Sequence, residues 1–183
     1  EILDKDLAYI LSAGIQVHTG VSVGTDLSVE ELQQRYDAVY IAIGAHSDKK
    51  LHLEGEEAQG VYSAVRLLRD IGEGRVPDFS GKRICVIGGG NVSMDATRTA
   101  KRLGAASVQC IYRRRLEDMT ALEEEIQAAM AEGCEIVTLE APSRIETDGN
   151  GQVTALWTQP QHIGPYNGKN RPNPVKADLP ERR

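Results

Sequence analysis

The sequence predicts a three-layer α/β fold built around a parallel sheet. Three observations carry this prediction. From residue 83 onward, apolar β-branched runs alternate with amphipathic helical stretches, and a run of glycines joins the first strand to its helix. The turn signal Asp148–Gly151 lies between two short strand-like stretches, so a small antiparallel hairpin is expected to append to the sheet.

The first part of the chain is predicted to belong to a different domain. A polar stretch begins at Ala45, and this change of composition predicts a boundary that separates residues 1–46 from residues 47–183. The elements predicted before the boundary are a helix over Asp6–Leu11, a strand at Ile15–Val17, a helix from the capping box at Ser28 to about Gln34, and a buried strand at Asp37–Gly44.

The second part predicts a parallel, doubly wound sheet, since its strands and helices alternate. From about Gln159 the composition turns to Pro, Gly, Asn and charge, which predicts an irregular tail. The predicted elements, in order, are a helix from Ser63 to about Ile71, strand Arg83–Ile87, helix Asn91–Leu103, strand Ser107–Tyr112, a helix from the capping box Thr120–Glu123 to about Gly133, strand Glu135–Leu139, and the hairpin of Ser143–Glu146 with Val153–Trp157.

The glycine run directly after the strand at residues 83–87 is the motif that carries chemistry. It fits G-x-G-x-x-small between a strand and a helix, the context of a Rossmann-like dinucleotide-binding turn. Gly88 would make the tight turn, Gly90 would let the backbone approach a pyrophosphate, and Ser93 is small enough for close packing. The helix N-terminus would hold the phosphates. The candidate cofactor-binding residues here are Gly88, Gly89, Gly90, Asn91, Val92 and Ser93. The plainer alternative is that the glycines only form a strand-to-helix turn.

Arginines stand where the adenosine ribose of a bound dinucleotide would lie. NAD enzymes usually place a carboxylate at the end of this second strand, whereas this chain has three arginines from Arg113 to Arg115. Guanidinium groups pair with a 2′-phosphate, so Arg113 and Arg114 are predicted to select NADPH over NADH. The alternative is a solvated basic turn that is compensated by Glu117 and Asp118.

Composition argues against several other classes of function. The net charge of −6 and the pI of about 5.3 give no reason to expect nucleic acid as a partner. No apolar run reaches membrane-spanning length and no signal-peptide pattern opens the sequence, so a cytoplasmic protein without a membrane partner is expected. The three cysteines are widely spaced, which argues against a metal site. No side chain is predicted to be catalytic.

Several linked motifs resemble the glutamate synthase small (beta) subunit family. The likeness covers Gly81–Ala100 around the glycine run and Tyr112–Ala121 around the arginines. Before the boundary, Tyr36–Val39 and Ala42–Ala45 resemble the stretch where that family passes from its flavin domain to its NADPH domain. One departure is Thr120, where the family usually has proline after the methionine, and it indicates a local loop difference.

The resemblance implies the NADPH-binding part of a flavin-dependent oxidoreductase. In the intact protein, hydride would pass from NADPH to FAD and electrons on to iron-sulfur centres. The implied partners are the remainder of the flavin domain and a large glutamate synthase subunit or a ferredoxin-like acceptor. Residues 1–46 would be a partial flavin-domain segment, and the 183 residues alone are expected to bind NADPH without turnover. A nucleotide-sensing or subunit-docking module without catalysis is the alternative.

Overall fold

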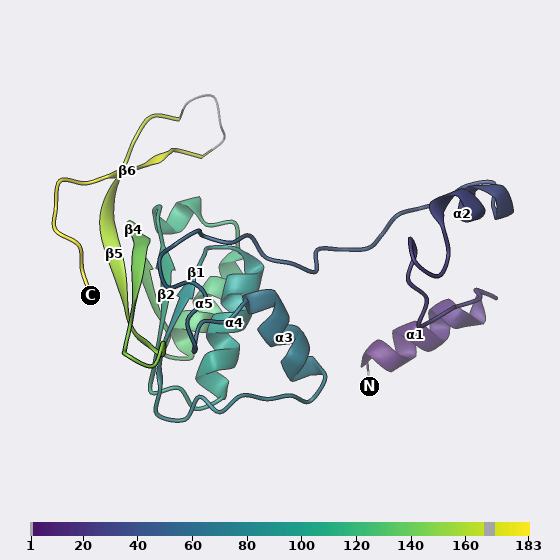
Figure 1. Ribbon diagram of the computed structural model, residues 1–183, viewed down its shortest axis with the longest axis horizontal. Helices are drawn as coiled ribbons and strands as arrows, with labels where there is room; N and C mark the ends of the chain where they lie inside the picture. The colour runs from purple at the N-terminus through teal and green to yellow at the C-terminus, as the bar shows by residue number, and fades with distance from the viewer. Residues whose placement is uncertain (1, 167–170) are drawn as a thin grey trace. The chain divides into compact units, whose positions relative to one another are not determined.

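The computed structural model describes residues 2–166 and 171–183, which divide into two compact units between Gly44 and Ala45 (Figure 1). The first unit contains the helices α1 (Ile2–Ser12) and α2 (Val29–Arg35). The predicted capping box of α2 is confirmed, because Ser28 Oγ accepts the Glu31 N–H at 3.1 Å and Glu31 Oε2 accepts the Ser28 N–H at 2.9 Å.

The two strands predicted in the first unit are wrong. Residues 15–17 and 37–44 form no β-ladder in the part of the chain that the structure describes, and none of the unit's described residues is buried. Tyr40 is 92% exposed and Ile41 is 74% exposed. A strand is held by hydrogen bonds to a neighbouring strand, so an apolar run becomes one only where a partner strand lies beside it.

The second unit is built on a parallel sheet whose three strands lie in the order β1 (Arg83–Ile87), β2 (Ser107–Tyr112) and β3 (Glu135–Thr138). α4 connects β1 to β2, and α5 connects β2 to β3, as the alternation of the sequence predicts. The helices of this unit are α3 (Ala64–Gly72), α4 (Asn91–Arg102), the short 3-10 helix η1 (Leu116–Asp118) and α5 (Glu123–Ala131). Ser63 caps α3, as expected.

The main apolar core lies between the parallel sheet and its two connecting helices. Val108 and Cys110 of β2 pack in one buried cluster with Met94 of α4 and with Ile126 and Ala129 of α5. Both helices therefore cover the same face, and the expectation of a doubly wound sheet is wrong.

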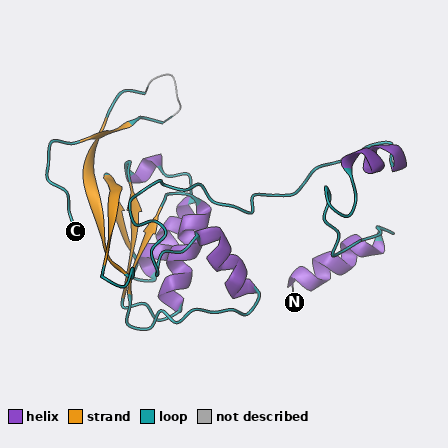
Figure 2. Ribbon diagram, in the orientation of Figure 1, coloured by secondary structure: helices purple, strands orange, loops and turns teal. Residues whose placement is uncertain are grey.

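The other face of the parallel sheet is covered by an antiparallel sheet of β4 (Glu140–Thr147), β5 (Val153–Ile163) and β6 (Pro174–Lys176) (Figure 2). The hairpin of β4 and β5 is the one predicted from the turn at residues 148–151, although both strands are longer than expected. The hairpin belongs to a separate sheet, so the expectation that it appends to the parallel sheet is wrong. Helices, parallel sheet and antiparallel sheet form the predicted three layers.

The irregular tail predicted from Gln159 is wrong over most of its described length. Residues 159–163 continue β5, and residues 161–163 pair with β6. Thr158 and Arg182 exchange two backbone hydrogen bonds of 2.8 Å. The partner of this polar stretch follows more than ten residues later in the chain, so local composition gave no signal of it. Residues 167–170 of the predicted tail lie outside the described residues.

No helix among the described residues is both long enough and apolar enough to cross a bilayer.

Met94 provides a test of the core. Its side chain is fully buried between α4 and the sheet, and we expect Met94→Ala to lower the free energy of unfolding by about 2–5 kcal/mol, measured by urea denaturation. Val92→Ala on the same helix is the control, because Val92 is 43% exposed and its truncation should cost about 0.5 kcal/mol or less. Equal losses for the two variants would contradict this description of the core.

Candidate functional site

The turn from β1 into α4 begins at Gly88, whose backbone is held on both sides. Its N–H donates to the Ile111 carbonyl at 3.1 Å, and its carbonyl accepts the Cys110 thiol at 3.2 Å. Burial raises the pKa of Cys110 to about 11, so the thiol stays protonated and able to donate. Gly88 has a φ of +139°, and a Cβ added there would collide with the hydroxyl of Ser93. The turn thus needs glycine at 88 and a small residue at 93.

Gly89 is buried beneath the ring of Tyr112. An added Cβ would lie 2.5 Å from a ring carbon of this tyrosine, so only glycine fits. The Gly89 carbonyl accepts the N–H groups of Thr120 and Ala121 at 2.9 and 3.0 Å, which ties the turn to the loop before α5. Proline at position 120, the usual residue in the resembling family, has no N–H to make the first of these bonds.

Gly90 differs from the two glycines before it, because its surroundings are open. It is the N-cap residue of α4, and an added Cβ would meet only Thr120 Oγ1 at 3.6 Å, an ordinary contact. The first N–H groups of a helix have no intrahelical acceptor, and no hydrogen bond among the described residues uses those of Asn91 and Val92. The turn therefore presents free donors beside an open backbone position.

The side chain of Asn91 replaces the capping box that was predicted for α5. Its Oδ1 accepts the Leu122 N–H at 2.9 Å, and Leu122 is the N-cap residue of α5 without a side-chain cap of its own. The predicted cap, Thr120, instead directs its hydroxyl toward the Gly89 carbonyl at 3.3 Å. The capping-box prediction was wrong because the hydroxyl and the N–H of Thr120 both point to the Gly89 carbonyl, which is distant in sequence.

Val92 and Ser93 also line a cavity of about 910 Å³ in the second unit. The cavity extends beside β1 to residues of the antiparallel sheet, including Ile145 and Ala155. Arg113 and Arg114 do not line it.

The three arginines after β2 have three different environments. Arg113 is exposed, and its guanidinium has no hydrogen bond or ion pair with any residue that the structure describes. Arg114 donates from Nε to the Pro172 carbonyl at 2.8 Å, and its own carbonyl accepts the Leu139 N–H at 3.0 Å. Arg114 thus joins the C-terminal segment to the corner between β3 and β4.

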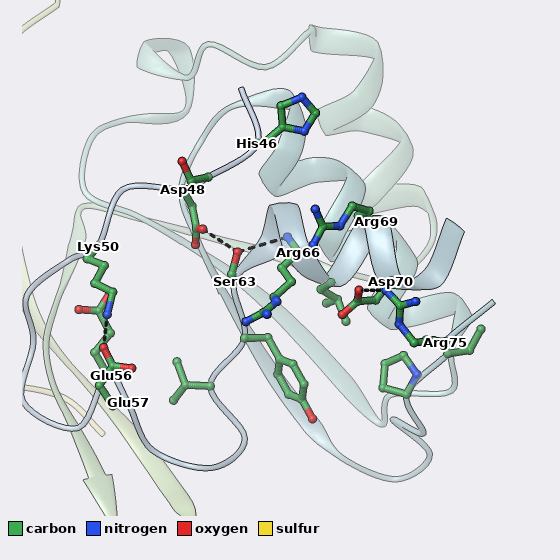
Figure 3. Close-up of a pocket in the computed structure, with 16 residues that line it drawn as sticks. His46, Asp48, Lys50, Glu56, Glu57, Ser63, Arg66, Arg69, Asp70 and Arg75 are labelled. Atoms are coloured by element: carbon green, nitrogen blue, oxygen red, sulfur yellow. Dashed lines mark hydrogen bonds and ion pairs between the residues drawn. The ribbon is translucent and has the colours of Figure 1, made fainter. Parts of the chain in front are cut away.

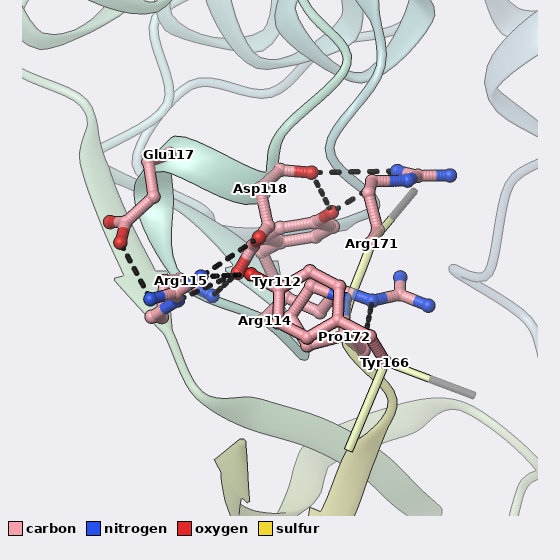
Figure 4. Close-up of polar contacts among 8 residues, drawn as sticks. All are labelled: Tyr112, Arg114, Arg115, Glu117, Asp118, Tyr166, Arg171 and Pro172. Atoms are coloured by element: carbon pink, nitrogen blue, oxygen red, sulfur yellow. Dashed lines mark hydrogen bonds and ion pairs between the residues drawn. The ribbon is translucent and has the colours of Figure 1, made fainter. Parts of the chain in front are cut away.

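Arg115 is committed to carboxylates of its own loop (Figure 4). Its guanidinium pairs with Asp118 at 2.9 Å and with Glu117 at 2.9 Å. The hydrogen bond from Arg115 holds the pKa of Asp118 below its ordinary value, and the same contacts raise the pKa of Arg115. The compensated basic turn considered in the sequence analysis therefore describes Arg115, while the groups of Arg113 and Arg114 remain unpaired with carboxylates among the described residues.

Two side chains at this site were not singled out from the sequence. Tyr112 covers Gly89 with its ring and donates from its hydroxyl to the Asp118 carbonyl at 2.7 Å. Arg171 reaches the same hydroxyl and the same carbonyl, at 3.5 and 3.4 Å, from the segment predicted to be irregular (Figure 4). The motif Tyr-Arg-Arg contained a signal for the tyrosine, but no local pattern marks Arg171.

Another hollow lies by α3, and several of its polar groups pair with one another (Figure 3). Asp48 accepts the Ser63 hydroxyl at 2.6 Å, Lys50 pairs with Glu57, and Arg75 pairs with Asp70. None of the predicted site residues lines this hollow. Within the described residues, no three His, Cys, Asp or Glu side chains gather as a metal site.

Comparisons with known proteins agree on one family. A family model described as pyridine nucleotide-disulphide oxidoreductase matches residues 4–164. The beta subunit of NADP(+)-dependent formate dehydrogenase from Moorella thermoacetica is 35% identical over 179 residues, which cover 96% of this chain and 25% of that protein. The NADPH glutamate synthase small chain of Escherichia coli (strain K12) is 34% identical over 181 residues, which cover 93% of this chain and 38% of that protein.

Among solved structures, FprA from Mycobacterium tuberculosis in complex with NADPH has a similar fold, with a TM-score of 0.71 at 21% identity. The match covers 88% of this chain and 51% of that one. The chain thus spans between a quarter and two fifths of the length of the two curated relatives above.

Substitutions at two neighbouring glycines test the packing of the turn. We expect Gly89→Ala to cost about 2–3 kcal/mol of unfolding free energy, because its Cβ would overpack the buried Tyr112 ring. Gly90→Ala is the matched control and should cost about 1 kcal/mol or less, since its Cβ has room. Urea denaturation of both variants decides the matter, and a larger loss for Gly90→Ala would contradict the described packing.

The pair of Arg115 and Asp118 predicts a pH-dependent contribution to stability. Because the folded pKa of Asp118 is lowered, the pair stabilises the fold fully above the unfolded pKa of about 4 and loses this effect as the pH falls through the folded pKa. Asp118→Asn should therefore lower the urea midpoint at pH 7, and the difference from the parent chain should shrink in acid. Glu117→Gln is the control, because Glu117 is exposed and pairs with the same arginine. A difference for Asp118→Asn that is constant from pH 7 to pH 3 would rule out the ion pair as its cause.

Proposed function

Because the chain belongs to the pyridine nucleotide-disulphide oxidoreductase family, we propose that it carries the NADPH-binding part of a flavin-dependent oxidoreductase similar to the glutamate synthase small subunit. One observation carries the proposal. A rigidly held glycine turn opens at Gly90 onto free helix N–H groups, and the neighbouring strand ends in an arginine that no described carboxylate neutralises.

The turn suits a pyrophosphate for a steric and an electrostatic reason. Ser93 and Tyr112 occupy the space that side chains at positions 88 and 89 would need, so these two glycines shape the turn. The open position at Gly90 would admit a ligand close to the backbone. The N–H groups of Asn91 and Val92 and the positive end of the α4 dipole favour an anion at that position. The side chain of Asn91 supports the site indirectly, since it holds the start of α5.

The arginines support NADPH over NADH. Arg113 follows β2 directly, at the strand end where a dinucleotide-binding fold places the adenosine ribose. Its uncommitted guanidinium would pair with a 2′-phosphate, and Arg114 would contribute the Nη groups that its bond to Pro172 leaves free. The names of the two curated relatives specify NADP(+) and NADPH for those proteins, which favours the same choice here.

The wider activity of the intact protein follows as part of the same proposal. When bound, NADPH would supply a hydride to FAD, and electrons would pass on to iron-sulfur centres. This chain's residues would bind and orient the donor, and no side chain need act as acid or base. Residues 1–46 would be part of a flavin domain and residues 47–183 the NADPH-binding domain. The relatives are named as a beta subunit and a small chain, which supports the remaining flavin domain and a large subunit or ferredoxin-like acceptor as partners.

Titration of the 183-residue chain with NADPH and with NADH tests this function. We expect saturable NADPH binding without turnover, and we expect Arg113→Ala to weaken it about tenfold to a hundredfold while NADH affinity changes little. Arg69→Ala is the control, because Arg69 is an exposed arginine on α3 and its loss removes the same charge.

Two results would count against the proposal. Equal affinity of the unaltered chain for NADPH and NADH would remove the assigned phosphate selectivity. Failure to bind either nucleotide would overturn the assignment of the glycine turn as a dinucleotide site.

A further inference from the structure

The chain returns to the end of β2 through the residues that precede β6. Pro172 is fully buried, and its carbonyl accepts the Nε–H of Arg114 at 2.8 Å. β6 then pairs antiparallel with β5. The segment that starts at Arg171 is therefore anchored at Pro172 and along β6, and this anchoring places Arg171 one residue from the carbonyl that Arg114 contacts.

The contacts of Arg171 leave its charge uncompensated. Its Nη1 lies 3.5 Å from the Tyr112 hydroxyl and 3.4 Å from the Asp118 carbonyl, and both acceptors are neutral. The Asp118 carboxylate is already engaged by Arg115. Arg171 forms no ion pair with a carboxylate of the described residues.

These contacts are also dispensable for holding the loop together. Distances of 3.4–3.5 Å lie at the long limit for a hydrogen bond, whereas Tyr112 donates to the Asp118 carbonyl at 2.7 Å without help from Arg171. In Figure 4 the guanidinium groups of Arg171 and Arg114 extend to the same side of the Tyr112 ring, while Arg115 extends to the other side toward Glu117. The arrangement leaves the Nε and Nη2 donors of Arg171 uncommitted among the described residues.

Tyr112 connects this guanidinium to the glycine turn. One face of its ring packs on Gly89, and its hydroxyl meets Arg171. A single rigid side chain thus spans the distance between the turn proposed to hold the pyrophosphate and the uncompensated cation.

We infer that Arg171 is a specificity-determining residue of the nucleotide site, where it joins Arg113 and Arg114 to hold the 2′-phosphate of NADPH. The inference rests on the proposed function and adds to it a residue from outside the strand-turn-helix motif. Guanidinium groups from two separate segments would surround the phosphate, which carries close to two negative charges and offers several acceptor oxygens.

Substitution by glutamine and by lysine separates phosphate binding from a structural role. Arg171→Gln keeps a neutral donor for the Tyr112 hydroxyl and loses the charge, so we expect NADPH affinity to fall about tenfold and NADH affinity to change less than twofold. Arg171→Lys restores a point charge without the guanidinium fork and should recover part of the NADPH affinity. Calorimetric titration with each nucleotide gives both numbers.

Lys176→Ala is the matched control, because Lys176 is an exposed cation in the same segment. It should leave both affinities within twofold of those of the parent chain. Urea midpoints of all variants identify any that fail to fold. Arg171→Lys remains informative if Arg171→Gln is one of them, because a partial loss of NADPH affinity with unchanged NADH affinity is expected only if Arg171 contacts the phosphate.

Two outcomes would overturn the role of Arg171. NADPH affinity that is unchanged in Arg171→Gln would show that the phosphate does not use this residue, and an equal loss for NADPH and NADH would show that it supports the fold of the site instead. These outcomes are distinct from failure of the proposed function, in which the unaltered chain binds neither nucleotide.

Discussion

The packing of the Tyr112 ring on Gly89 places every other part of the site. The ring fills the space that a side chain at position 89 would need, so only glycine fits there. The Gly89 carbonyl accepts hydrogen bonds from the loop at 120–121. From this contact the hydroxyl of Tyr112 reaches the Asp118 carbonyl, which fixes η1 and the loop of arginines. The glycine turn and the cations are therefore coupled through one side chain, and a ligand that touches both would meet a preorganised frame.

Three consecutive arginines of the same chemistry acquire different roles because their neighbours differ. Arg115 has two carboxylates within its own turn, so its charge is balanced locally. Arg114 donates one hydrogen bond to a backbone carbonyl of the C-terminal segment, and Arg113 is exposed to solvent. Among the described residues, Arg113 and Arg114 therefore keep their positive charge without a carboxylate partner, and this is the property on which the proposed phosphate contact depends.

Elements whose interaction partners lie nearby in the sequence could be predicted from the sequence. β1 and β2 follow directly from apolar runs, and α4 follows from the helical stretch between the glycine turn and Gly104. The capping box at Ser28 appears as predicted because all of its groups lie within four residues. The errors share one cause. The extension of β5, the use of Thr120 by Gly89 and the place of Arg171 all depend on partners that lie more than ten residues away, and composition within a short window contains no information about them. The apolar run at 37–44 shows the converse, since β propensity without a neighbouring strand gives no ladder.

The distant partners also suit the proposed site, in which Arg171 comes from a segment far from the glycine turn in the sequence. Neighbouring guanidiniums at a strand end repel one another unless carboxylates intervene, and a carboxylate that intervenes also repels a phosphate. Asp118 neutralises Arg115 in this way, so the charge of Arg115 is not available to a phosphate. A cation carried in from a separate segment needs no carboxylate of this loop to hold it in place, because its backbone is anchored independently by the burial of Pro172 and the pairing of β6 with β5. The antiparallel sheet therefore does more than cover the parallel one, since the segment that leads into β6 places Arg171 beside Tyr112 and the Asp118 carbonyl.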